Sequence, residues 1–157
     1  MKLPDSLYDF LAAQTTLTLG TINSDGSPYL SDLFYAHDSA LVFYFLSDPH
    51  TRHAQNLTRT PQVSVTVHQT VKDWQTIRGV QMIGEARHIN HVQERAHAFE
   101  IYIAKFPFVR EWLASVDALE QKHPLFGVVE LYKITPRWLR WIDNTQGFGH
   151  KEEFEFH

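Results

Sequence analysis

Alternating apolar and polar positions recur along this chain and predict β-strands. In residues 63 to 68, Val63, Val65 and Val67 alternate with polar residues, and residues 16 to 21 alternate in the same way. Successive side chains of a strand point to opposite faces, so this pattern is typical of strands with one buried face. Further strands are predicted over residues 29–37, 77–89, 126–134 and 138–143, and an apolar run over residues 41–46 predicts a buried strand.

Apolar residues at helical spacing predict three helical segments besides these strands. Leu7, Phe10 and Leu11 indicate a first helix over residues 5–14. Asn90 followed by Gln93 resembles a capping box and predicts the start of a helix that ends or kinks at Pro107. Its expected apolar stripe is Val92, Ala96, Phe99 and Ile103, and a second helical piece would contain Val109, Trp112, Leu113 and Val116.

The apolar strand 41–46 leads directly into a cationic helix start. Ser47 or Asp48 can cap this helix, and Pro49 suits its first turn. Arg52 and His53 then lie among backbone N–H groups that have no partner within the helix, where an anion is favoured. A phosphate-bearing ligand is the natural candidate for this position.

The order of these elements indicates an α+β fold. Hairpin-length turns join most neighbouring strands, which predicts a mostly antiparallel sheet with flanking helices. Six or seven such strands favour closure into a small barrel, with Pro136 marking a break or an edge. The chain is 43% hydrophobic over 157 residues, so we expect a single domain spanning residues 1–157.

Composition excludes several classes of protein. The chain has no cysteine, which rules out disulfides and thiolate catalysis and fits a cytoplasmic protein. A net charge of −4 with both signs dispersed gives no footprint for nucleic-acid binding. No apolar run approaches the roughly 20 residues of a membrane span, so we expect a soluble, unprocessed protein without a membrane contact.

Specific residues in the middle third of the chain resemble a known superfamily. They are Phe45-Leu46-Ser47, Arg52, Leu57, Pro61, Val63-Ser64-Val65 and Arg78-x-Val80-x-x-x-Gly84-x-Ala86. This pattern resembles the FMN-binding split-barrel superfamily of pyridoxamine 5′-phosphate oxidase. Three blocks, beginning at Thr51, Ile77 and Asp143, are similar to its YhbP-like (UPF0306) branch.

The resemblance implies a homodimer with FMN in a cleft at the subunit interface. The phosphate would lie near Thr51, Arg52 and His53, and the flavin ring along Leu46 and Ser47. The function implied is a flavin-dependent oxidoreductase acting on a small, unidentified substrate, with the chemistry supplied by the flavin. The candidate cofactor-binding residues are Leu46, Ser47, Thr51, Arg52, His53, Trp74, Gln81, Asn144 and Lys151.

Departures from the oxidase pattern lower the expected affinity for FMN. His53 replaces a lysine, no Lys or Arg lies between Tyr29 and His37, and Gly79 replaces a flavin-facing glutamine. Gln81 lies on the same strand face as Gly79 and could substitute for that glutamine. The substrate-binding residues of the oxidase are also missing near the C-terminus, so we do not expect pyridoxamine phosphate as the substrate.

Alternatives stay open for several of these residues. Trp74 could stack on a ring or fill a dimer contact, and the block 144–151, with two glycines, could cover a cofactor or form a turn before a charged tail. His88, His91 and His97 cross a strand-to-helix boundary, and we expect no metal site there. Two other functions stay open: a non-enzymatic flavin-binding or sensing module, and a haem protein that uses a residue such as His150. The sequence names no catalytic acid, base or nucleophile.

Overall fold

The computed structural model describes residues 3–111 and 129–157. Helices and strands follow in the order α1 (Asp5–Ala13), β1 (Thr16–Ile22), β2 (Pro28–Phe34), β3 (Ala36–His37), β4 (Phe43–Ser47), α2 (Arg52–Arg59), β5 (Gln62–His68), η1 (Trp74–Thr76), β6 (Arg78–His88), α3 (Val92–Lys105), β7 (Glu130–Asp143), η2 (Asn144–Gln146) and β8 (Lys151–Glu155). Residues 107–111 are also helical. The predicted helical positions Trp112, Leu113 and Val116, and the strand start predicted at Phe126, lie outside the described residues.

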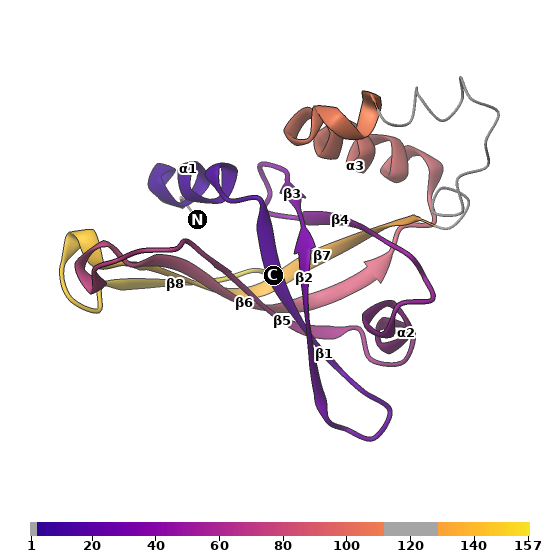
Figure 1. Cartoon of the computed structure of the whole chain (residues 1–157), viewed down its shortest axis with the longest axis horizontal. Coiled ribbons are helices and arrows are strands. Elements are labelled where there is room, and N and C mark those ends of the chain that lie inside the picture. Colours follow the sequence, from indigo (N-terminus) through magenta and orange to yellow (C-terminus); the bar gives the residue numbers. More distant parts are fainter. Residues whose placement is uncertain (1–2, 112–128) are drawn as a thin grey trace.

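The strands form one curled antiparallel sheet, which confirms the predicted α+β split barrel. The strand order is β2-β1-β5-β6-β7-β4-β3, with β8 paired to β7. In Figure 1, α1 and α3 lie above the sheet and α2 lies below it at the right. Among the described residues the sheet has eight strands, because the strand predicted over 29–37 divides at Tyr35, the two strands predicted around Pro136 form the single strand β7, and residues 151–155 add β8.

One face of the strands packs against α1 and α2 to form the main core. Leu7, Phe10 and Leu11 of α1 are buried there, as the helical spacing predicted, and Val63, Val65 and Val67 of β5 are buried beside them. Burying a side chain of this kind is worth about 1.5–3 kcal/mol. The alternating residues on the opposite side of β1, β2, β5, β6 and β7 form a second face, here called the outer face.

Strand β7 is continuous through Pro136, whereas the sequence predicted two strands around a break. Pro136 pairs with Gly84 of β6 at a shift in register. On its other edge, β7 pairs with β4 through residue 134 and with β8 from Trp138 onward. The proline therefore lies where the ladder changes partners, a position at which a missing N–H is tolerated.

Two helix predictions need correction. Helix α2 is capped by Thr51, not by Ser47 or Asp48, because residues 48–50 form a turn before the helix begins. Helix α3 begins at Val92 with His91 as its N-cap, so Asn90 is not the cap. Val92 is exposed and Ala98, Tyr102 and Ile103 form the buried face, because contact with the rest of the fold decides which face of a weakly amphipathic helix is covered.

Within the described ranges, no helix combines the length and the apolar character that crossing a bilayer requires.

Candidate functional site

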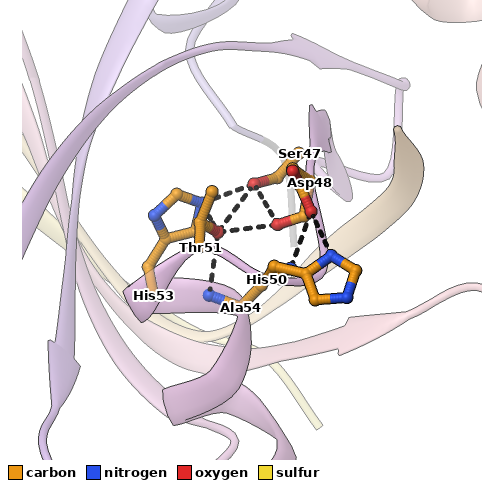
Figure 2. A network of polar contacts seen from close by, with 6 residues as sticks. All are labelled: Ser47, Asp48, His50, Thr51, His53 and Ala54. Carbon is orange, nitrogen blue, oxygen red and sulfur yellow. Dashed lines mark hydrogen bonds and ion pairs between the residues drawn. The ribbon is translucent and has the colours of Figure 1, made fainter. Parts of the chain in front are cut away.

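The turn between β4 and α2 forms a compact corner of polar side chains (Figure 2). The Asp48 carboxylate accepts a hydrogen bond from the backbone N–H of His50 at 2.7 Å and contacts the His50 ring at 2.9 Å. Thr51 donates its hydroxyl to the Asp48 carbonyl at 2.8 Å and accepts from the Ala54 N–H at 3.4 Å. These bonds fix the position at which α2 begins, as an N-cap does in general.

His53 lies at the centre of this corner and contacts three hydroxyl groups. Its Nε2 lies 2.7 Å from Ser47 Oγ and 3.1 Å from Thr51 Oγ1, and its Nδ1 lies 3.1 Å from Ser31 Oγ. The Thr51 and Ser47 hydroxyls both have the Asp48 carbonyl as an acceptor, at 2.8 and 3.3 Å, so we assign the ring proton to Nε2, which then donates to the two hydroxyl oxygens. In a neutral ring Nδ1 then accepts from Ser31.

Burial lowers the pKa of His53 below its ordinary value of 6.5. The side chain is 7% exposed and has no carboxylate among its hydrogen-bond partners. The ring is therefore neutral near pH 7. His53 supplies an N–H donor at the place where the oxidase pattern has a lysine, but it does not supply a positive charge.

Arg52 supplies a positive charge to the corner, in which the Asp48 carboxylate is negatively charged. Its guanidinium carbon lies 5.3 Å from the centre of the Tyr29 ring, within cation–π distance. The backbone N–H groups of Arg52 and His53 are the first two of α2, and they have no partner one helical turn earlier. The Arg52 side chain and the first two amide N–H groups of α2 thus belong to one helix end, an arrangement that suits an anion.

The remaining predicted residues do not all lie at this corner. Leu46 faces the opposite side of β4 from Ser47 and packs against the buried cluster that includes Tyr102 and Ile103 of α3. Gln81 lies on the outer face, where Arg140 Nη1 donates to its side-chain oxygen at 3.2 Å. It lines a cavity of about 320 Å³. Leu46 and Gln81 therefore lie on other surfaces than the corner itself.

Trp74 and Asn144 lie at the far end of the sheet from α2, in the β5–β6 and β7–β8 loops drawn at the left of Figure 1, and Lys151 begins β8 directly after the second loop. Asn144 Nδ2 donates to the Trp74 carbonyl at 2.8 Å, which joins the β5–β6 loop to the β7–β8 loop. Trp74 and Phe148 meet edge to face at 5.1 Å and are 52% and 83% exposed. We call this exposed pair and its loops the aromatic tip.

The block 144–151 is a connection between strands, and the charged tail expected after it is strand β8. Gly147 and Gly149 adopt positive φ angles of 140° and 70°, as their predicted conformational freedom allows. Phe154 of β8 is buried in the main core. Lys151, the first residue of β8, is exposed and pairs with Ile142.

Sequence reasoning missed Ser31, Tyr29 and Arg59. Tyr29 and Ser31 are two residues apart in β2 and share the face that meets α2. Arg59 follows Arg52 by two helical turns on α2. The sequence signals for these residues were the two-residue spacing of Tyr29 and Ser31 and the seven-residue spacing of Arg52 and Arg59. Neither spacing reveals which element of the fold packs against these side chains.

The curled antiparallel sheet, its flanking helices and the donor-rich corner at the start of α2 define a split-barrel protein of the pyridoxamine 5′-phosphate oxidase type. A family model described as "Pyridoxamine 5'-phosphate oxidase" matches residues 3–140, and the chain belongs to this family. The chain is 33% identical to the UPF0306 protein YhbP of Escherichia coli O157:H7 over 154 residues, which cover 96% of this chain and 92% of that protein. Both findings confirm the resemblance seen in the motifs.

Solved structures show the same fold. A conserved hypothetical protein of Mycobacterium tuberculosis, Rv2991, matches with a TM-score of 0.72 and 24% identity, covering 96% of this chain and 91% of that one. HutZ, described as a haem storage protein of Vibrio cholerae, matches with a TM-score of 0.62 and 20% identity over 99% of this chain and 95% of its own. At these identities the likeness concerns the fold.

Proposed function

We propose that this protein binds FMN, with the phosphate at the corner formed by Thr51, Arg52 and His53. The observation that carries the proposal is that Arg52 and the backbone N–H groups of Arg52 and His53, which have no partner within the helix, stand together at the start of α2. Phosphate is the anion that such a set of donors accommodates best. Membership of the pyridoxamine 5′-phosphate oxidase family supports a flavin as the phosphate-bearing ligand.

The proposal includes a homodimer in which two subunits share each cofactor cleft. Within one chain, the aromatic tip and the α2 corner lie at opposite ends of the long strands β6 and β7. A two-fold axis across the outer face would bring the tip of one subunit toward the corner of the other. Exposed Leu30 and Ile83 on that face, 66% and 53% accessible, favour such a contact.

When bound, the flavin would supply two-electron transfer to a small substrate. The chain's own residues would hold the phosphate, restrict solvent and orient the ring, with Gln81 as the candidate donor to its pyrimidine edge. Arg140 already donates to the Gln81 oxygen, which leaves the amide NH₂ of Gln81 to face a ligand. We propose a cytoplasmic location as well, which the lack of cysteine supports.

Replacing Arg52 tests the phosphate assignment. A charge-assisted hydrogen bond is worth about 1.5–3 kcal/mol, so Arg52→Ala should weaken FMN binding by roughly 10- to 150-fold. Riboflavin has no phosphate, so its affinity should change little. Quenching of flavin fluorescence gives both dissociation constants. An equal loss for the two ligands would show that Arg52 does not contact the phosphate.

The absorbance spectrum of the purified protein separates FMN from haem, the second candidate. Haem is favoured by the structural match to HutZ and by His150, whose buried Nε2 has no hydrogen-bond partner among the described residues. Flavin bands support the FMN proposal, and an intense Soret band supports haem. If flavin binds but no reductant of the nicotinamide or dithionite class reduces it, the protein is a flavin-binding module and not an oxidoreductase.

A further inference from the structure

The side of α2 that faces the β1–β2 turn carries a polar stripe that FMN would not use in full. Arg52, Gln55, Asn56 and Arg59 follow one another at the spacing of one helix face. Together with Asn23, Ser24 and Asp25 of the β1–β2 turn they line a cavity of about 290 Å³. Arg52 therefore borders both the α2 corner and this second cavity.

Asn56 fixes the direction of Arg59. Its side chain is 1% exposed and donates from Nδ2 to Thr21 Oγ1 and to Asn23 Oδ1, each at 3.0 Å. Its Oδ1 accepts from Arg59 Nη2 at 2.7 Å. The Arg59 guanidinium is thus anchored by a fully hydrogen-bonded buried amide, and its other N–H groups stay available to a ligand.

The two arginines of the cavity differ from most arginines of the chain. Arg87, Arg95, Arg110, Arg137 and Arg140 each form an ion pair with a glutamate. In the part of the chain that the structure describes, neither Arg52 nor Arg59 lies within ion-pairing distance of a carboxylate. Against these two arginines the cavity lining has one carboxylate, that of Asp25, so the lining has a net positive charge that favours an anionic ligand.

Asp25 gives the cavity one hydrogen-bond acceptor. Its Oδ1 accepts from the Ser27 N–H at 2.9 Å and from the Ser27 hydroxyl at 2.6 Å, which lowers the pKa of the carboxyl group. The second oxygen stays free to accept from a hydroxyl. A carboxylate of this kind recognises the hydroxyl groups of a ribose in other nucleotide sites.

We infer that this cavity accepts the second phosphate and the ribose of a flavin dinucleotide, so that the ligand class is FAD in addition to FMN. The inference rests on the proposed flavin binding at the α2 corner. Arg52 would contact the flavin-proximal phosphate, Arg59 the distal phosphate, and Asp25 the adenosine ribose. A volume of about 290 Å³ fits these groups and leaves the adenine ring at the protein surface.

The test compares riboflavin, FMN and FAD on the full-length protein and its variants by fluorescence titration. Arg59→Ala should weaken FAD by about tenfold or more while FMN changes less than about twofold, since only FAD carries a distal phosphate. Arg52→Ala should weaken both nucleotides. Arg87→Ala, a surface arginine outside the cavity, is the matched control and should change neither.

Arg59→Lys is a second variant that separates a lost ligand contact from a folding defect, because lysine retains the positive charge. We expect this variant to keep part of the preference for FAD and to melt within a few degrees of the wild type. If FMN and FAD lose affinity equally in Arg59→Ala, or if wild-type protein binds FMN but rejects FAD, the dinucleotide inference is wrong and the FMN proposal stands. If no flavin binds, the proposed function itself fails.

Discussion

His53 shows how a single buried side chain changes the chemistry of the corner. Its Nε2 donates to Ser47 and Thr51, and its Nδ1 accepts from Ser31, 22 residues earlier in the chain. A neutral ring held in one tautomer orders three hydroxyl groups without adding charge. Any phosphate bound here would depend on Arg52 for its positive charge.

At the scale of single residues, we predict that His53 makes the free energy of unfolding depend on pH. Burial lowers the folded-state pKa of His53, so the unfolded chain binds a proton first as the pH falls below about 6.5. The stability contributed by neutral His53 is therefore present above this pH and is lost as the pH falls toward the folded pKa. His53→Gln, which cannot be protonated, should show a smaller drop in unfolding free energy between pH 7.5 and 5.5.

Urea denaturation at the two pH values measures this effect. His37 also has a pKa lowered by burial, so part of the drop should remain in the variant. His68→Gln, at an exposed position of β5, is the control and should keep the wild-type drop. The same drop in all three proteins would contradict the neutral tautomer. An NMR spectrum showing the proton on Nδ1 would also contradict it.

At the scale of elements, the bulge between β6 and β7 depends on a glycine. A Cβ atom at Gly84 would lie 2.3 Å from the Thr135 carbonyl oxygen and 3.1 Å from Pro136 Cα, and both of these are backbone atoms. The two strands approach this closely where their register shifts. Only a residue without a side chain fits without moving the ladder.

We predict that Gly84→Ala lowers the unfolding free energy by about 1–3 kcal/mol, the usual cost of overpacking. Gly20→Ala is the matched control in β1, because the closest atom to a Cβ there is the Ser64 hydroxyl oxygen at 2.5 Å, which rotates away. The control should cost less than about 1 kcal/mol. Denaturant unfolding of both variants gives the comparison, and equal losses would show that the bulge tolerates a side chain.

At the scale of the whole molecule, the outer face is the surface that a second subunit would cover. The chain carries 4 Trp, 6 Tyr and 11 Phe residues, more aromatic surface than one small core readily hides. Leu30 and Ile83 belong to one cross-strand row of the outer face, on either side of Gly20 and Ser64. Together they border the cavity of about 320 Å³ that also contains Gln81.

We predict that the wild-type protein sediments as a dimer at micromolar concentration, and that Ile83→Glu shifts it toward the monomer. A buried glutamate without a partner is costly at an apolar interface, whereas it is tolerated in water. Val92→Glu is the control, because Val92 is 76% exposed on α3, away from the outer face. A monomeric wild-type protein, or a dimer unaffected by Ile83→Glu, would exclude this interface.

The periodic helices and strands could be predicted from the sequence because the apolar residues that form the periodic pattern are the ones that the core buries. Strand β5 is buried at Val63, Val65 and Val67, and α1 at Leu7, Phe10 and Leu11, as the spacing predicted. Strand β8 was missed because Lys151–Glu155 buries only Phe154 and carries charge at most other positions. Charged residues are common on edge strands, where they hide the alternating pattern.

The sequence by itself determined the family, the α+β class and the cationic start of α2, because these depend on local spacing and on motifs within short segments. Tertiary structure decided which residues meet. Ser31 of β2 contacts His53 of α2. Asn56 of α2 donates to Thr21, 35 residues earlier in the chain, and accepts a hydrogen bond from Arg59. Such contacts follow from strand register and from the curl of the sheet, and no local pattern encodes them. For the same reason, only the structure showed that the aromatic tip and the α2 corner lie at opposite ends of β6 and β7.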